Sequence, residues 1–201
     1  APQRLVDGLE FVASDPTALQ CFQFMNRVMR DQRLASQVAE ARKSDSALSI
    51  AQARHNVEAA EADGKPVASW RPFQLAFILM QLGALTNPTA SLRSAEHEAR
   101  VELLFFPTGG GKTEAYLGLA AYTFAIRRRQ AVVQSNEGPL NGSDGVSVLM
   151  RYTLRLLTAQ QFQRALHRSV FAVAAMQGDE AARKTLPPKL AQVALGGVEG
   201  M

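Results

Sequence analysis

The sequence has almost no cysteine and no long apolar run. Cys21 is its single cysteine, which excludes an internal disulfide and a cysteine-based metal site and fits a reducing compartment. No apolar run approaches the ~18 residues that a transmembrane helix needs, and no charged-then-apolar stretch opens the chain. We therefore expect a cytoplasmic protein with no membrane partner.

The composition that is present is typical of a folded protein with a substantial core. Hydrophobic residues make up 47% of the 201 residues and charged residues 20%, so the chain is not disordered overall. The net charge of +4 slightly favours an anionic partner, although the basic residues are spread along the chain. His55, His97 and His167 stand far apart and predict no metal site.

The first third of the chain is predicted to be helical. Pro16, following Ser14 and Asp15, marks a helix start, and residues 17 to about 43 carry apolar residues at helical spacing. A second, alanine-rich helix is predicted from about 46 to 62, where glycine and proline then end it. We predict a helical accessory region over residues 1–66 and a second region, over residues 67–201, that carries every chemical motif.

Two strand-and-helix units are predicted in the second region. The apolar run 101–106 is typical of a strand buried in a parallel sheet, and a helix follows at 112–129. Residues 136–144 indicate a flexible loop, and 146–150 form the next predicted strand, which leads into a helix to about 177. Successive units of this kind favour a doubly wound arrangement. The predicted fold class is α/β, with a parallel sheet covered by helices on both faces.

A glycine-rich turn lies between the first predicted strand and its helix, in the sequence FPTGGGKT from 106 to 113. Glycines adopt positive φ and let backbone N–H groups approach an anion, which the N-terminus of a helix also favours. In a P-loop of this spacing Lys112 reaches the β and γ phosphates and the Thr113 hydroxyl binds Mg²⁺. Phe106 departs from the full pattern, which has glycine there, and the alternative is a chance glycine turn.

The P-loop pattern predicts a site for ATP and Mg²⁺. Lys112 and Thr113 are the predicted catalytic residues, and Thr113 is the predicted metal ligand. The predicted phosphate-binding residues are Thr108, Gly109, Gly110, Gly111, Lys112 and Thr113.

A family resemblance covers residues 70 to about 177. It rests on three stretches, WRPFQLAFILM, FPTGGGKTEAYLGLAAYTF and GVSVLMRYTLRLLTAQQFQRA. Together they resemble the N-terminal RecA-like lobe of the helicase-like subunit of DISARM bacterial anti-phage systems. The resemblance implies a RecA-like P-loop NTPase sheet in residues 67–201. It also implies an ATP-dependent, DNA-interacting motor of helicase superfamily 2, with a DUF1998-type partner subunit and a DNA methyltransferase as partners.

The resemblance also implies roles for residues outside the P-loop. Superfamily 2 enzymes place a glutamine upstream of it, which implies that Gln74 reads the adenine edge while Phe73 stacks on the ring. The alternative is a polar helix start with Phe73 in the core. In such motors the strand-to-helix junction, here at 150–164, holds the backbone of a nucleic-acid strand. The implied DNA-binding residues are Arg151, Thr153, Arg155 and Gln161, with Arg164 as an outer contact; the alternative is a solvated helix face.

The chain departs from a complete motor because no acidic box and no arginine finger are visible in it. Asp179 and Glu180 follow a predicted helix and indicate a helix-ending loop. We therefore expect the ATP-binding lobe of a superfamily 2 DNA helicase or translocase in anti-phage defence, with slow ATP hydrolysis by this chain alone. The alternative is a non-catalytic module that binds nucleotide or a partner and serves assembly only.

Overall fold

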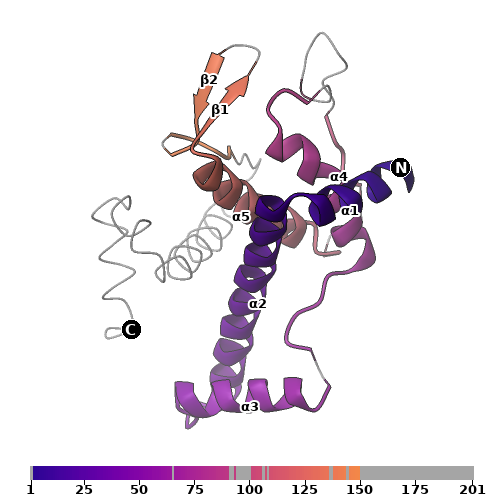
Figure 1. The fold of residues 1–201 in the computed structure, drawn as a ribbon. Helices are drawn as coiled ribbons and strands as arrows, with labels where there is room; N and C mark the ends of the chain where they lie inside the picture. The colour runs from indigo at the N-terminus through magenta and orange to yellow at the C-terminus, as the bar shows by residue number, and fades with distance from the viewer. Residues whose placement is uncertain are drawn as a thin grey trace. The chain divides into compact units, whose positions relative to one another are not determined.

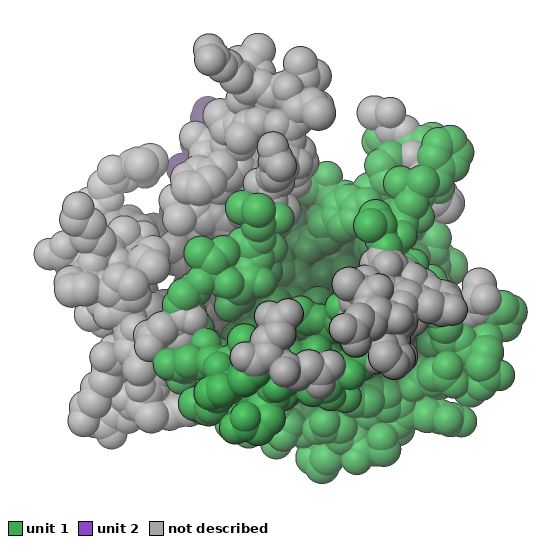
Figure 2. All heavy atoms as spheres, turned by 90° about the horizontal axis from the view of Figure 1, so that it is seen from above, with its two compact units in different colours: residues 1–26, 70–150 green, residues 27–69, 151–201 purple. Residues whose placement is uncertain are grey.

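The computed structural model describes residues 2–64, 66–90, 93, 101–105, 107, 109–135, 138–143 and 145–149. Its elements, in chain order, are α1 (Pro2–Ser14), α2 (Pro16–Ser44), α3 (Ile50–Ala62), α4 (Pro72–Thr86), α5 (Lys112–Gln130), β1 (Val132–Ser135) and β2 (Gly138–Asn141) (Figure 1). The chain divides into two compact units, residues 1–26 with 70–150 and residues 27–69 with 151–201 (Figure 2). We call these unit 1 and unit 2. The functional division predicted at residue 66 stays a prediction.

The predicted RecA-like α/β fold with a parallel sheet is wrong. The described chain is mainly helical, and the sheet that it contains has two strands, β1 and β2, which pair antiparallel with Val132 opposite Asn141 and Ser135 opposite Gly138. Within the predicted strands, residues 101–105 and 146–149 lie outside any strand. Val101, Leu103 and Phe105, expected in a sheet core, are 98%, 83% and 89% exposed.

The physical reason is that an apolar run makes a strand only when a neighbour pairs with its backbone. A parallel neighbour has to be brought in by a long crossover, whereas β1 and β2 are adjacent in sequence and pair locally. The flexible loop predicted at 136–144 is therefore wrong for Gly138–Asn141, which form β2. Helix propensity needs no distant partner, and the helices predicted from residue 17, from about 46 and from Lys112 are confirmed as α2, α3 and α5.

Capping side chains explain where two of the helices begin. The Asp15 carboxylate accepts hydrogen bonds from the backbone N–H groups of Thr17 and Ala18, at 2.8 and 3.0 Å, and so caps the start of α2. Ser49 and Gln52 form a reciprocal capping box at the start of α3. These caps satisfy N–H groups that no helical carbonyl can reach.

In unit 1, α4 and α5 lie side by side and run in the same direction. Near their N-terminal ends, the Gln74 side chain contacts Gly111, and towards their C-terminal ends the hydroxyls of Thr86 and Tyr122 are 2.6 Å apart. The shared interior is apolar, and its fully buried side chains include Ile78, Leu82, Tyr122 and Ile126. α4 also packs on α1, where a Cβ on Gly8 would collide with the backbone carbonyl of Leu79.

Arginines secure the C-terminal ends of the same two helices. Arg127 of α5 donates to the backbone carbonyls of Leu85, at 2.7 Å, and Thr86 at the end of α4. Arg128 donates to the Gly142 carbonyl, and Arg129 donates to the Gln20 side chain at 2.7 Å. Burial lowers the pKa of Arg127, the nearby Arg93 lowers it further, and Tyr122 raises it.

Unit 2 has its own small apolar core, formed where α2 meets α3 and the segment that follows it. Its buried residues are Leu34, Val38, Ala53 and Val67. Arg30 and Glu61 form an ion pair beside this core, and hydrogen bonding to Arg30 lowers the pKa of the Glu61 carboxyl. Among the described residues no helix is long and apolar enough to cross a membrane.

Candidate phosphate-binding turn

The turn before α5 has the backbone conformation that its glycines predict. Gly109 has φ of 80° and Gly111 has φ of 91°, both in the left-handed region that favours glycine. The Gly110 N–H donates to the Pro107 carbonyl at 3.1 Å, which closes the turn. At Gly111 space is restricted too, because a Cβ there would lie 2.7 Å from the Gln74 Nε2 atom. Any side chain at Gly111 is therefore excluded twice, by backbone conformation and by contact.

The first turn of α5 brings one basic and one acidic side chain to this glycine turn. Gly111 is the N-cap of α5, so Lys112, Thr113 and Glu114 are its first three residues. Lys112 folds back across the turn and donates from Nζ to the Pro107 carbonyl at 3.2 Å. The Glu114 carboxylate lies on the Gly111 side, with Oε2 3.4 Å from the position of a Cβ on Gly111. The α5 N-terminus itself offers N–H groups that have no carbonyl partner within the helix.

The start of α4 is hydrogen-bonded to the same turn. Gln74 donates from Nε2 to the Gly111 carbonyl at 2.7 Å, and Arg71 donates from Nη1 to the Gly110 carbonyl at 2.8 Å. Gln74 is also the third residue of α4, where its Oε1 accepts from the Arg71 N–H at 2.8 Å. Two consecutive carbonyls of the glycine turn are thus held by the side chains of Arg71, the N-cap of α4, and Gln74, within α4.

Trp70 anchors the segment that carries these two residues. Its indole Nε1 donates to the Asn26 side chain at 2.6 Å, and its ring lies over Gly118 of α5, where a Cβ would come within 2.9 Å of the ring. The small residue at 118 therefore lets the indole approach the α5 backbone. Trp70, Arg71 and Gln74 together fix the start of α4 against the first half of α5.

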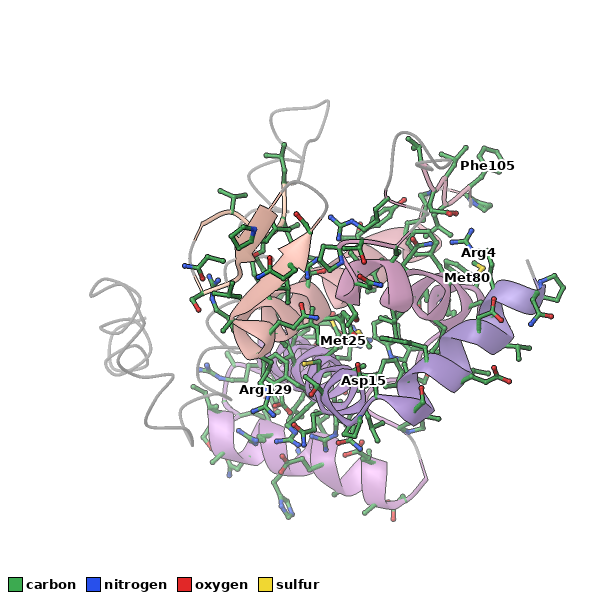
Figure 3. All side chains as sticks on the ribbon, turned by 45° about the horizontal axis from the view of Figure 1, so that its top comes forward. Arg4, Asp15, Met25, Met80, Phe105 and Arg129 are labelled. Carbon is green, nitrogen blue, oxygen red and sulfur yellow. The ribbon has the colours of Figure 1, made fainter. Side chains whose placement is uncertain are left out.

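Among the described residues of the segment that leads into the turn, Glu102 is tied to the helices of unit 1. Arg4 of α1 forms an ion pair with Glu102 at 2.7 Å and donates to the Met80 carbonyl of α4 at 3.2 Å. Figure 3 shows Arg4 beside Met80, with the Phe105 ring directed outward. Glu102 is therefore tied to the helices of unit 1 while the apolar side chains around it stay exposed.

The structure brings most of the predicted nucleotide-binding residues together. Gln74, Gly110, Gly111 and Lys112 are linked through the contacts above, and Thr113 follows them on α5; Phe73 is partly buried on α4 beside Gln74. The predicted Thr108 and the predicted DNA-binding residues lie outside the described residues, as do Asp179 and Glu180; the DNA-binding residues are Arg151, Thr153, Arg155 and Gln161.

The functional roles of these residues stay predictions, since the geometry alone does not test them. In the part of the chain that the structure describes, no group of three or more His, Cys, Asp and Glu side chains could hold a metal ion. The sequence pattern assigned no role to Trp70 and Arg71, although both lie in the WRPFQ stretch that carries the resemblance. No local signal in the sequence indicates this role of Arg71, because the Gly110 carbonyl that it holds lies 39 residues further along the chain.

Comparison with known proteins gives a clear relative. DISARM protein DrmA of Bacillus paralicheniformis is 39% identical to this chain over 165 residues, which are 81% of this chain. The chain is related to DrmA. The predicted resemblance to a DISARM subunit is thereby confirmed. The chain spans only about 13% of the length of DrmA. No family model matches the chain, and no solved structure matches it.

Proposed function

We propose that this chain is the triphosphate-binding part of a DrmA-like protein of DISARM anti-phage defence, and that the whole protein is an ATP-driven DNA translocase or helicase. The observation that carries the proposal is the glycine turn at the N-terminus of α5, with its left-handed glycines and Lys112 beside it. The relationship to DrmA supports the defence role.

The turn fits a phosphate group in three respects. Glycines remove the side chains that would keep an anion away, the N-terminal end of α5 attracts negative charge, and Lys112 adds a full positive charge. ATP with Mg²⁺ is the proposed ligand. Lys112 is the proposed contact to the β and γ phosphates, and the Thr113 hydroxyl is the proposed Mg²⁺ ligand.

DNA is the proposed second ligand. The proposed contacts are Arg151, Thr153, Arg155 and Gln161, through charge and hydrogen bonds to the strand's backbone rather than to its bases. A DUF1998-type subunit and a DNA methyltransferase are the proposed protein partners, on the grounds of the family resemblance. Cytoplasmic location is part of the same proposal.

A second candidate is a non-catalytic module that binds nucleotide for assembly. It is favoured by the shortage of carboxylates near the turn, because Glu114 is the acidic residue that the described contacts bring to it. Phosphoryl transfer needs carboxylates that hold Mg²⁺ and an arginine from elsewhere. The two candidates differ in whether bound ATP is turned over in the full-length protein.

The test of the proposed site is the substitution Lys112→Ala. Removing the charge-assisted hydrogen bond to phosphate should weaken ATP binding by about tenfold or more, equivalent to roughly 1.5–3 kcal/mol. Calorimetric titration with Mg²⁺ and ATP measures this, with Lys43→Ala as control because Lys43 lies exposed on α2. If wild type and Lys112→Ala are both folded and bind ATP with equal affinity, the proposed site is wrong.

A further inference from the structure

Both ends of the Gln74 amide are used by the protein itself. Its Oε1 accepts from the Arg71 N–H at 2.8 Å, and its Nε2 donates to the Gly111 carbonyl at 2.7 Å. The side chain is 4% exposed. Each end of the amide keeps one further hydrogen-bond position, but the residue is buried, so an adenine edge could reach it only if the contact to the start of α4 or to the glycine turn opened.

These contacts determine which way the turn's N–H groups face. The peptide bonds of the described residues are trans, so the carbonyl of one residue and the N–H of the next point in opposite directions. Arg71 holds the Gly110 carbonyl and Gln74 holds the Gly111 carbonyl on the α4 side. The N–H groups of Gly111 and Lys112 are thereby directed away from the side chains that hold these carbonyls.

We propose that Gln74, with Arg71, is a positioning pair that orients the turn's N–H groups for a triphosphate, and that Gln74 does not read the base. The inference rests on the proposed function and sharpens it, since the ligand class becomes any nucleoside triphosphate. Orientation is achieved before the ligand arrives, so the pair contributes to phosphate affinity without touching phosphate.

The test compares three ligands, each with Mg²⁺: ATP, GTP and inorganic triphosphate. Wild type should bind ATP and GTP alike, and Gln74→Ala should weaken all three by the same factor, roughly tenfold. Gln74→Glu is the second variant. It keeps the acceptor for the Arg71 N–H and the side-chain size but sets an oxygen against the Gly111 carbonyl, so it should show the same uniform loss. Gln81→Ala, the same substitution further along α4, is the matched control and should bind like wild type.

Hydrogen exchange of the ligand-free protein gives an independent readout. The amides of residues 109–113 should exchange faster in Gln74→Ala than in wild type or Gln81→Ala, because the turn loses its tether.

The outcomes separate the inference from the function on which it rests. If wild type binds the ligands but Gln74→Ala loses affinity for ATP alone, or its exchange is unchanged, Gln74 is a base reader or a bystander and the inference is overturned. If wild type binds none of the three ligands, the proposed function fails and the proposed specificity fails with it.

Discussion

Cys21 shows how strongly position alone changes the chemistry of one residue. It is buried on α2, and burial raises the pKa of its thiol from 9.0 to about 11. The positive charge of Arg129 lowers the pKa and Asp15 raises it, both by less than burial does; these two residues are labelled in Figure 3. A thiol of this kind is a poor nucleophile at neutral pH.

The raised pKa of Cys21 predicts a specific pH dependence of stability. The folded state holds the thiol proton to higher pH than the unfolded state, so this contribution is complete below pH 9 and is lost as the pH rises towards 11. Between pH 8 and 10.5 wild type should lose ~2 kcal/mol more unfolding free energy than Cys21→Ala does. Urea unfolding at both pH values measures the difference. Two variants that lose stability in parallel would contradict it, since the Cys21 thiol is the titrating group that the substitution removes.

Gly118 is the position where the Trp70 ring and the Ile78 side chain of α4 pack directly against the backbone of α5. A Cβ there would meet the Trp70 ring at 2.9 Å and the Ile78 side chain at 3.4 Å. Gly83 of α4 offers a comparison, because a Cβ there would meet nothing within 4 Å. The two helical glycines therefore differ in packing and share the same backbone freedom.

The substitutions Gly118→Ala and Gly83→Ala should change stability in opposite directions. Alanine favours a helix over glycine, so Gly83→Ala should stabilise the fold by roughly 0.4–1 kcal/mol. At Gly118 the overlap with Trp70 should outweigh that gain and destabilise by about 1–3 kcal/mol. Chemical unfolding of the two variants beside wild type decides this. A stabilised Gly118→Ala would mean that the indole moves aside at little cost.

At the scale of elements, the sequence predicts helices here far better than strands. Helix starts depend on neighbours in the chain: Pro16 after Asp15 marks α2, and Gly111 before Lys112 marks α5. The run 101–106 carries equally strong local signals for a strand, but pairing depends on a distant neighbour that periodicity does not identify. α1 lies in the region 1–66 that was predicted to be helical, but it was not predicted as a separate helix. The β1–β2 hairpin was not predicted, although Val132 and Val133 are β-branched residues typical of a strand.

The candidate site was partly predictable for the same reason. The glycine turn and Lys112 follow from a contiguous pattern whose meaning is local. The contacts of Gln74 and Arg71 to Gly111 and Gly110 join residues 37 and 39 positions apart, and the sequence held no indication that the amide was already occupied. The pattern indicated residues that lie together at the turn, and only the fold shows which atoms they use; their roles stay predictions.

At the scale of the whole molecule, the chain corresponds to a small share of DrmA. The proposed DNA contacts lie in the C-terminal part of this chain. Electrostatic contacts to a strand's backbone release counterions, so binding falls as salt rises. The proposal therefore predicts a salt slope and no strong base preference.

Replacing Arg151 and Arg155 together by alanine should weaken binding to a mixed-sequence single strand. For every phosphate that the variant no longer neutralises, the slope of log K against log salt should fall by roughly 0.7. Fluorescence anisotropy over a salt series measures both the affinity and the slope. The control is Arg33→Ala with Arg54→Ala, which removes the same charge from exposed positions on α2 and α3. If both double variants lose affinity equally, net charge and not a specific junction explains the binding.

The parallel course of α4 and α5 has an electrostatic consequence. Two helices that run in the same direction present ends of the same sign together, each equivalent to roughly half an elementary charge. Their positive ends, at Arg71 and Gly111, converge where the glycine turn lies. Their negative ends also converge, and there Arg127 reaches the last carbonyls of α4 from the last turn of α5. The pair is thus polarised along its length. Arg127 offsets the negative potential at the C-terminal ends. At the N-terminal ends the positive potential favours a bound anion.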